Sequence, residues 1–258
     1  MPDRTYRWVI RAFRILFRAL GLRLDVRGSH QVPSFGPAVL ACNHIGYLDF
    51  TFAGLAGTER GRLIRFMAKQ STFDNRLSGP LMRAMGHIPV DRNNGAAAYR
   101  RATRKLQRGE LVGVFPEATI SRAWTLKPFK LGAATLAVRE QVPLIPVVVW
   151  GGHRILTVAG HWSLRRHKSV MVLVGEPILA AANDDPAMVD VELRRRMQAL
   201  LDTAQREYPD QPSSDADRWW LPEHLGGTAP SPASAALLDA AALAATDRTG
   251  RAILGAGA

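Results

Sequence analysis

Short apolar runs alternate along most of the chain with segments in which apolar residues recur at helical spacing. The apolar runs predict strands at residues 38–43, 63–68, 87–90, 111–115, 144–150 and 170–174. The helical spacing predicts helices at about residues 48–55, 77–85, 96–108, 132–140 and 187–207. This alternation predicts an α/β fold with a largely parallel central sheet flanked by helices.

Residues 4–20 carry a different helical pattern. The arginines form one stripe at intervals of three and four residues, and almost every residue between them is apolar; the stripe consists of Arg4, Arg7, Arg11, Arg14 and Arg18. This pattern favours an amphipathic helix that docks on an anionic membrane surface. A helix packed on the domain core, with its arginine edge in solvent, is the alternative that the pattern leaves open.

Three regions follow from these patterns. Residues 1–27 contain the basic amphipathic helix, residues 28–208 form the α/β domain, and residues 209–258 form a Pro/Ala-rich tail. Within the tail, residues 233–246 could form a small helix and the last dozen residues look loose. We expect the pair Trp219-Trp220 to pack in the fold rather than insert into a membrane.

Composition adds a charge signal. The formal net charge is +12, the isoelectric point is about 10.9, and only five of the 34 basic residues are lysines. Arginine binds phosphate in a fork, so the charge indicates phosphate-bearing partners: nucleic acid, an anionic membrane surface or a phosphorylated substrate. No run approaches the 18 apolar residues of a membrane-spanning helix, and arginines interrupt the N-terminal segment where a secretory signal would lie.

Cys42 is the single cysteine, so no internal disulfide can form and a reducing compartment is plausible. It ends an apolar run, where a cysteine usually behaves as a small buried hydrophobe rather than a nucleophile.

The candidate chemistry begins where the first of these strands ends, in Asn43-His44-Ile45-Gly46-Tyr47-Leu48-Asp49. Residues five apart do not share a helix face, so His44 and Asp49 can meet only across a turn, which Gly46 could provide. A carboxylate on one imidazole nitrogen fixes the tautomer and leaves the other nitrogen to act as a base. The alternative is that Asp49 caps the next helix while His44 makes a local loop contact.

Polar residues also follow other predicted strands: Lys69, Arg92 and Glu117. Ligands of open parallel sheets bind beyond the carboxyl ends of the strands. We therefore expect His44 and these three residues to converge on one edge of the sheet.

These blocks resemble the glycerolipid acyltransferase family, typified by 1-acylglycerol-3-phosphate acyltransferase. Five blocks occur in family order within roughly residues 28–178: Asn43-His44…Asp49, Gly86-His87-Ile88-Pro89-Val90-Asp91-Arg92, Phe115-Pro116-Glu117 with Thr119 and Ser121, Phe129-Lys130-Leu131-Gly132-Ala133, and Val142-Pro143-Leu144-Ile145-Pro146-Val147. Lys69 also stands where the family often has a lysine.

The resemblance implies a role for each block. His44 would be the general base that takes the proton of an acceptor hydroxyl, and Asp49 would orient it. The substrate-binding residues would be Glu117 in the acceptor pocket, Lys69 and Arg92 on a polar head group, and Thr119, Ser121, Arg122 and Lys130 near them. The acyl donor would be a thioester of CoA or of acyl carrier protein, with no cofactor or metal, and the enzyme would lie on the cytoplasmic face of the cell membrane as a peripheral or monotopic protein.

The third block departs from the family pattern. The family usually has Gly-Thr-Arg after the glutamate, and this chain has Ala118-Thr119-Ile120. Ile120 cannot bind a phosphate, so Arg122, Lys127 or Lys130 would have to compensate. A lysophospholipid, with lysophosphatidate first, is the expected acceptor, and a glycolipid or glycan hydroxyl is the alternative. A non-enzymatic basic protein that binds membranes or nucleic acid is a third interpretation, which the charge and the basic helix at 96–108 would suit. Apart from Tyr99, aromatics are not interleaved with these basic residues as stacking platforms, which disfavours nucleic acid. The sequence leaves the oligomeric state open.

Overall fold

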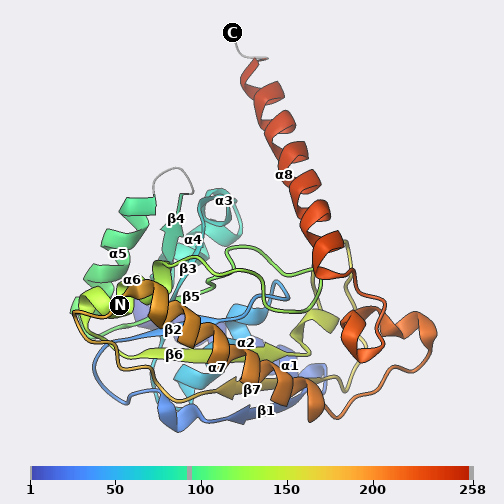
Figure 1. Cartoon of the computed structure of the whole chain (residues 1–258), viewed down its shortest axis with the longest axis horizontal. Helices are drawn as coiled ribbons and strands as arrows, with labels where there is room; N and C mark the ends of the chain where they lie inside the picture. The colour runs from blue at the N-terminus through green and yellow to red at the C-terminus, as the bar shows by residue number, and fades with distance from the viewer. Residues whose placement is uncertain (1, 92–94, 256–258) are drawn as a thin grey trace. The chain divides into compact units, whose positions relative to one another are not determined.

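The computed structural model describes residues 2–91 and 95–255 (Figure 1). The chain divides into two compact units. The first consists of Met1–Ile120 and Pro128–Asp210, and the second of Ser121–Lys127 and Gln211–Ala258.

The first unit is built on a seven-stranded sheet in the order β1-β7-β6-β2-β5-β3-β4. The strands are β1 (Arg23–Arg27), β2 (Ala38–Cys42), β3 (Ile64–Lys69), β4 (Ile88–Val90), β5 (Leu111–Val114), β6 (Leu144–Trp150) and β7 (Ser169–Val174). Strands β2 to β6 are mutually parallel, whereas β7 runs antiparallel to β6 and β1 pairs with β7. The predicted α/β fold with a largely parallel sheet is confirmed.

Helices cover both faces of this sheet (Figure 1). The helices α1 (Pro2–Ala19) and α2 (Asp49–Thr58) pack on one face, while α5 (Gly95–Gln107), α6 (Gly132–Glu140) and α7 (Pro186–Arg206) pack on the other. Leu40, Cys42 and Val147 face α2 in the larger hydrophobic core. Because both faces are covered, β2, β6 and β7 are buried along their whole lengths, which is why they read as continuous apolar runs.

The structure differs from the sequence prediction at two places. Strand β1 was not predicted, because its sequence Arg-Leu-Asp-Val-Arg is half polar and lies at the edge of the sheet. The helix expected at 77–85 is present as α4 (Ser78–Ala84), but a second short helix that was not predicted, α3 (Gln70–Asp74), precedes it. Asn75 separates them in an extended conformation, and its side chain accepts hydrogen bonds from the backbone of Leu77 and Ser78.

Helix α1 packs on the domain core, which is the second interpretation of its pattern, and it also has an exposed face. Tyr6 and Phe17 are buried, and the Tyr6 hydroxyl donates a hydrogen bond to the carbonyl of Ile64 at 2.8 Å. The opposite face leaves Trp8 and Ile15 about two-thirds exposed beside the arginines. The helix therefore packs on the core and still presents a mixed apolar and basic surface.

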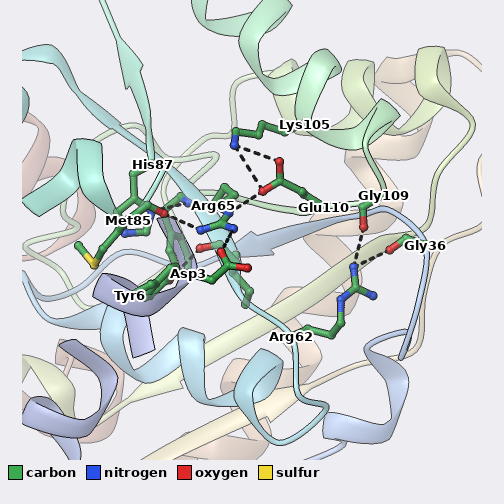
Figure 2. A network of polar contacts seen from close by, with 12 residues as sticks. Asp3, Tyr6, Gly36, Arg62, Arg65, Met85, His87, Lys105, Gly109 and Glu110 are labelled. Atoms are coloured by element: carbon green, nitrogen blue, oxygen red, sulfur yellow. Dashed lines mark hydrogen bonds and ion pairs between the residues drawn. The ribbon is translucent and has the colours of Figure 1, made fainter. Parts of the chain in front are cut away.

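An ion-pair network fastens the start of α1 to the sheet (Figure 2). The buried guanidinium of Arg65 in β3 bonds Asp3 at 2.7 Å, Glu110 at 2.6 Å and the carbonyl of Met85 at 2.6 Å. Lys105 of α5 pairs with Glu110 from its other side at 3.0 Å. One arginine of β3 thus joins α1, the residue before β5 and the end of α4.

The second unit contains two short 3-10 helices, Asp215–Trp220 and Glu223–Leu225, and the helix α8 (Pro232–Gly255). Trp220 is buried and the indole N–H of Trp124 donates to the carbonyl of Trp219 at 2.8 Å, so this tryptophan pair lies in a packed region. Helix α8 continues well beyond residue 246, where the sequence suggested loose chain. Within the described part of the chain, none of the helices combines the length and apolarity needed to cross a membrane.

Candidate active site

The candidate site begins where β2 leaves the sheet. The amide of Asn43 donates to the carbonyl of Val149 at 3.0 Å and accepts from its N–H at 2.7 Å. The side chain thereby replaces the backbone pairing that β6 would otherwise require. Asn43 is fully buried, so the chain turns away from the sheet at a fixed point and His44 is the first residue beyond it.

A tight turn brings His44 and Asp49 together. One carboxylate oxygen of Asp49, Oδ2, accepts from the backbone N–H of Ile45 and of Gly46 at 2.7 Å each, and lies 3.1 Å from His44 Nδ1. Asp49 is the first residue of α2, and its carboxylate points back into the turn instead of capping the helix. The geometry therefore favours the histidine–carboxylate pair over the alternative of a helix cap.

The two side chains differ in exposure. The Asp49 side chain is fully buried, whereas that of His44 keeps 22% of its surface exposed. The imidazole stacks on the ring of Phe115, with centroids 4.4 Å apart. When Nδ1 donates its hydrogen to Asp49, Nε2 is the nitrogen that carries the lone pair, and the stacked ring holds the imidazole in one orientation.

Glu117 connects the third block to the first. It follows β5, is buried, and its Oε1 accepts from the backbone N–H of His44 at 2.8 Å. After β5 the chain turns at Ala118, which has a left-handed backbone (φ 60°) and whose N–H donates to the carbonyl of Phe115 at 3.0 Å. Because β2 and β5 are adjacent and parallel, residues 73 positions apart meet at one edge. The predicted convergence is confirmed for His44 and Glu117.

The other predicted site residues are placed as follows. Lys69 ends β3 at the same edge and is exposed, as is Lys130, whose backbone N–H donates to the carbonyl of Pro116 at 2.9 Å. Thr119 is half-buried next to the buried Ile120. Arg92 lies outside the described residues.

Ser121 and Arg122 belong to the second unit. The hydroxyl of Ser121 donates to the carbonyl of Thr125 at 2.6 Å. Arg122 pairs with Asp239 of α8 at 2.9 Å, and Lys127 pairs with the other oxygen of the same carboxylate at 2.5 Å. Two of the three cations that could replace the missing arginine of the third block, Arg122 and Lys127, therefore have Asp239 as a partner within this unit.

Two residues that the sequence reading did not single out support the turn. Thr157 donates its hydroxyl hydrogen to the carbonyl of Ile45 at 2.6 Å. Gly152 approaches Asp49 so closely that a β-carbon there would stand 3.4 Å from Oδ1 and 3.0 Å from the ring of Phe52. Both lie more than 100 residues away from the turn, and no local pattern in the sequence marks them.

Gly46 allows close packing of the backbone, whereas the sequence analysis expected it to provide the turn. Its backbone is not left-handed; a β-carbon on Gly46 would instead lie 3.1 Å from both the Cα of His153 and the carbonyl oxygen of Leu156. The glycine is required because the segment after β6 passes directly over the turn.

The cysteine is unsuited to catalysis. Cys42 is fully buried, and this burial raises the pKa of its thiol, so the thiolate is suppressed. Among the residues that the structure describes, no three His, Cys, Asp or Glu side chains are grouped so that they could hold a metal ion.

An apolar pocket lies beneath α1, on the α2 side of the sheet. Its lining includes Val9, Ile10, Phe13, Phe50 and Leu55. Phe50 follows Asp49 directly, and a line of rings connects the pocket to the histidine: Phe50 contacts Phe66 at 6.2 Å between centroids, Phe66 contacts Phe115 at 5.8 Å, and Phe115 stacks on His44.

Comparison with known proteins agrees with this geometry. The model of the family described as Acyltransferase matches residues 23–150, which include the whole His44–Asp49 turn and Glu117. The chain belongs to the acyltransferase family that this model describes.

Relatives of this acyltransferase carry a common name. This chain is 30% identical over 167 residues to 1-acyl-sn-glycerol-3-phosphate acyltransferase BAT2, chloroplastic, of Brassica napus. The aligned part covers 63% of this chain and 47% of the plant protein. This chain is 28% identical over 174 residues to the 1-acyl-sn-glycerol-3-phosphate acyltransferase of Bacillus subtilis (strain 168), covering 67% and 82%. The chain thus spans about half of the plant relative's length and most of the bacterial one's.

The fold of the acyltransferase also has a solved counterpart. The crystal structure of the 1-acyl-sn-glycerophosphate (LPA) acyltransferase PlsC from Thermotoga maritima superposes with a TM-score of 0.62 at 20% identity, covering 79% of this chain and 83% of that one. At 20% identity, this similarity shows a shared fold only.

Proposed function

We propose that this acyltransferase moves a fatty acyl group from a thioester donor to the hydroxyl of a lysophospholipid, with lysophosphatidate as the first candidate. The observation that carries the proposal is the His44–Asp49 pair in the turn after β2, where a buried carboxylate holds a partly exposed imidazole. Both relatives are named 1-acyl-sn-glycerol-3-phosphate acyltransferase, and this name supports the choice of acceptor.

His44 is the general base in this proposal. Nε2 takes the proton of the acceptor hydroxyl while the hydroxyl oxygen attacks the thioester carbonyl, and Asp49 stabilises the imidazolium that forms. Collapse of the tetrahedral intermediate breaks the carbon–sulfur bond. The imidazolium then returns the proton to the thiolate, which leaves as a thiol, so His44 ends in its starting state.

Glu117 acts on the backbone of the base. Its bond to the N–H of His44 holds the β2 and β5 ends together, which supports a positioning role for one of its oxygens. We assign the remaining acceptor contacts to Lys69, Lys130 and Arg92 on the head group and to Thr119.

The apolar pocket lined by α1 and α2 suits the acyl chain. Its lining is mostly apolar, and the packed rings of Phe50, Phe66 and Phe115 lie between it and His44. The donor is a thioester of CoA or of acyl carrier protein, and the reaction requires no cofactor or metal. The mixed apolar and basic face of α1 supports docking on an anionic membrane, which we place at the cytoplasmic face.

A second acceptor class has one specific observation in its favour. Ile120 stands where the family usually has a phosphate-binding arginine, and it is buried with 8% exposure. An uncharged acceptor, such as the sugar hydroxyl of a glycolipid, does not need that arginine.

The test is thiol release from long-chain acyl-CoA, with acyl carrier protein thioester as a second donor, against lysophosphatidate, other lysophospholipids and a glycolipid. We expect one acceptor class to drive turnover and His44→Ala to lower it by about 10²–10⁴-fold. His30→Ala, at an exposed histidine outside the site, is the matched control and should behave like the parent. Unchanged turnover in His44→Ala would exclude His44 as the base.

A further inference from the structure

The connection between β6 and β7 contains a short β-hairpin, residues 155–163, that the proposed reaction does not use. Leu156 pairs with Trp162 across it, and backbone bonds of 2.9 Å join Thr157 to His161 and Ser163 to Ile155. Ala159 and Gly160 form the tip with left-handed backbones (φ 61° and 75°). Both strands of the hairpin are held, so its two faces are well defined.

One face of the hairpin is fixed to the catalytic turn. Ile155 and Thr157 are buried, and the Thr157 hydroxyl bonds the carbonyl of Ile45. The N–H of Tyr47 donates to the carbonyl of Leu156 at 3.1 Å. These contacts reach the residues between His44 and Asp49, so the hairpin lies beside the candidate base.

The other face of the hairpin is apolar and exposed. Side chains directly opposite one another on a hairpin point to the same face, so Leu156 and Trp162 share the outward side. Trp162 is 68% exposed and Leu164, just after the hairpin, is 58% exposed. Tyr47 of the catalytic turn is also half exposed. A group of large exposed apolar side chains such as this one marks an interaction surface.

The charge next to these side chains indicates which partner. Arg165 and Arg166 are exposed immediately after Leu164. Between residues 141 and 175 the sequence contains no aspartate or glutamate. An exposed aromatic and aliphatic face followed by two exposed arginines matches the anionic lipid interface, where tryptophan sits at head-group level and arginine binds lipid phosphate.

We propose that residues 155–166, the interfacial hairpin, dock the enzyme on an anionic lipid bilayer. Trp162 and Leu164 enter the head-group region, and Arg165 and Arg166 bind lipid phosphates. The inner face of the hairpin holds the turn between His44 and Asp49. Membrane binding by the hairpin therefore orients the side of the protein that carries His44 toward the lipid surface. The inference rests on the proposed function in one respect: a lipid acceptor would then reach the base from the bilayer.

The interfacial hairpin is a second contact, distinct from the face of α1. The two are connected, because the N–H of His167 donates to the carbonyl of Leu20, directly after α1, at 3.0 Å. Because the two surfaces consist of different residues, loss of the hairpin contact should weaken membrane binding and leave the contribution of α1 in place.

The experiment is sedimentation of the full chain with vesicles of phosphatidylcholine containing about one-third phosphatidylglycerol, and with pure phosphatidylcholine vesicles. We expect Trp162→Ala to lower partition into the anionic vesicles by at least threefold. The double variant Arg165→Glu/Arg166→Glu should lower it by about tenfold or more, an effect that high salt abolishes.

Matched controls come from elsewhere on the first unit. Leu179→Ala removes an apolar side chain that is 78% exposed and follows Ile178, which pairs with Leu144 at the amino end of β6. Arg104→Glu/Arg108→Glu makes the same change in net charge on exposed residues of α5 and the loop after it. Both controls should bind vesicles like the parent. Equal losses in the hairpin and control pairs, or parental binding by the hairpin variants, would overturn the proposal.

A turnover measurement separates this proposal from the proposed function. With short-chain, monomeric lysophosphatidate and acyl-CoA and no vesicles, Trp162→Ala should turn over at the parental rate. If no protein turns over any acceptor while vesicle binding follows the expected pattern, the proposed function fails and the docking surface stands. If turnover is normal and vesicle binding ignores the hairpin, the docking surface alone fails.

Discussion

At the scale of single residues, Asp49 determines the shape of the candidate site. One carboxylate oxygen receives two backbone N–H groups and the imidazole of His44, all from inside a fully buried position. An amide keeps one oxygen for these donors but carries no negative charge to stabilise the imidazolium, and its NH2 group would be buried at the position of Oδ1, which has no hydrogen-bond partner among the described residues. We expect Asp49→Asn to lower turnover by at least about 10²-fold and the free energy of unfolding by about 1–3 kcal/mol. Thiol release and urea unfolding measure the two effects, with the surface change Asp74→Asn as control; parental turnover in Asp49→Asn would contradict the assignment.

Asn43 offers a second prediction at the same scale. Its amide both donates to and accepts from the backbone of Val149, and a carboxylate of equal shape can only accept. Asn43→Asp should therefore lower the free energy of unfolding by about 1–3 kcal/mol and reduce turnover, because the start of the His44 turn loses its anchor. Denaturant unfolding together with thiol release tests this. A variant that is as stable as the parent would show that the pairing with β6 contributes little.

At the scale of elements, the attachment of α1 depends on one buried arginine of β3 (Figure 2). Arg65 is 6% exposed and bonds Asp3, Glu110 and the carbonyl of Met85. Arg65→Met leaves that carbonyl and much of Glu110 uncompensated, so we expect a loss of about 3 kcal/mol in the free energy of unfolding and faster proteolysis within α1. Asp3→Ala is the matched comparison: Asp3 is half exposed, and its loss should cost less than about 1 kcal/mol. Equal effects of the two changes would mean that the ion pair, and not the buried arginine, fastens the helix.

At the scale of the whole molecule, His87 couples stability to pH. Its Nδ1 accepts from the N–H of Phe66 at 3.0 Å, and burial, aided by the charges of Arg65 and Lys105, lowers the pKa of His87 to about 3. The folded-state pKa lies below the ordinary value of 6.5, so the neutral form stabilises the fold fully above pH 6.5, and this contribution is lost as the pH falls from 6.5 toward 3. The slope reaches at most about 1.4 kcal/mol per pH unit for one proton.

His87→Asn isolates that contribution, because the amide oxygen can replace Nδ1 as the acceptor for Phe66 and does not titrate. We expect the variant to be less stable at pH 7.5 through lost ring contacts, and its unfolding free energy to change less between pH 6.5 and 5. Below about pH 4.5 both proteins should weaken, since Lys105 and Arg65 lower the pKa of Glu110 and its protonation removes stability there, while the parent keeps the additional slope from His87 down to about pH 3. Denaturant unfolding at a series of pH values measures the slopes; an unchanged slope in the variant would place the acid sensitivity elsewhere.

The sequence by itself determined the order of strands and helices and the candidate base. Apolar runs locate β2, β5 and β6 because both faces of a covered parallel sheet are apolar, and the carboxyl ends of parallel strands bring His44 and Glu117 to one edge. Edge strand β1 lay beyond this reasoning, because a half-exposed strand has no continuous apolar run.

Only the tertiary structure decided which groups hold the turn and what covers it. The contacts of Asn43 with Val149, Thr157 with Ile45 and Gly152 with Asp49 join residues about 100 positions apart, and no spacing along the chain encodes them. The outward direction of Trp162 likewise depends on its pairing with Leu156 in the hairpin. Local periodicity reports which face of an element is buried, whereas the partner across that face is set by how the chain folds back on itself.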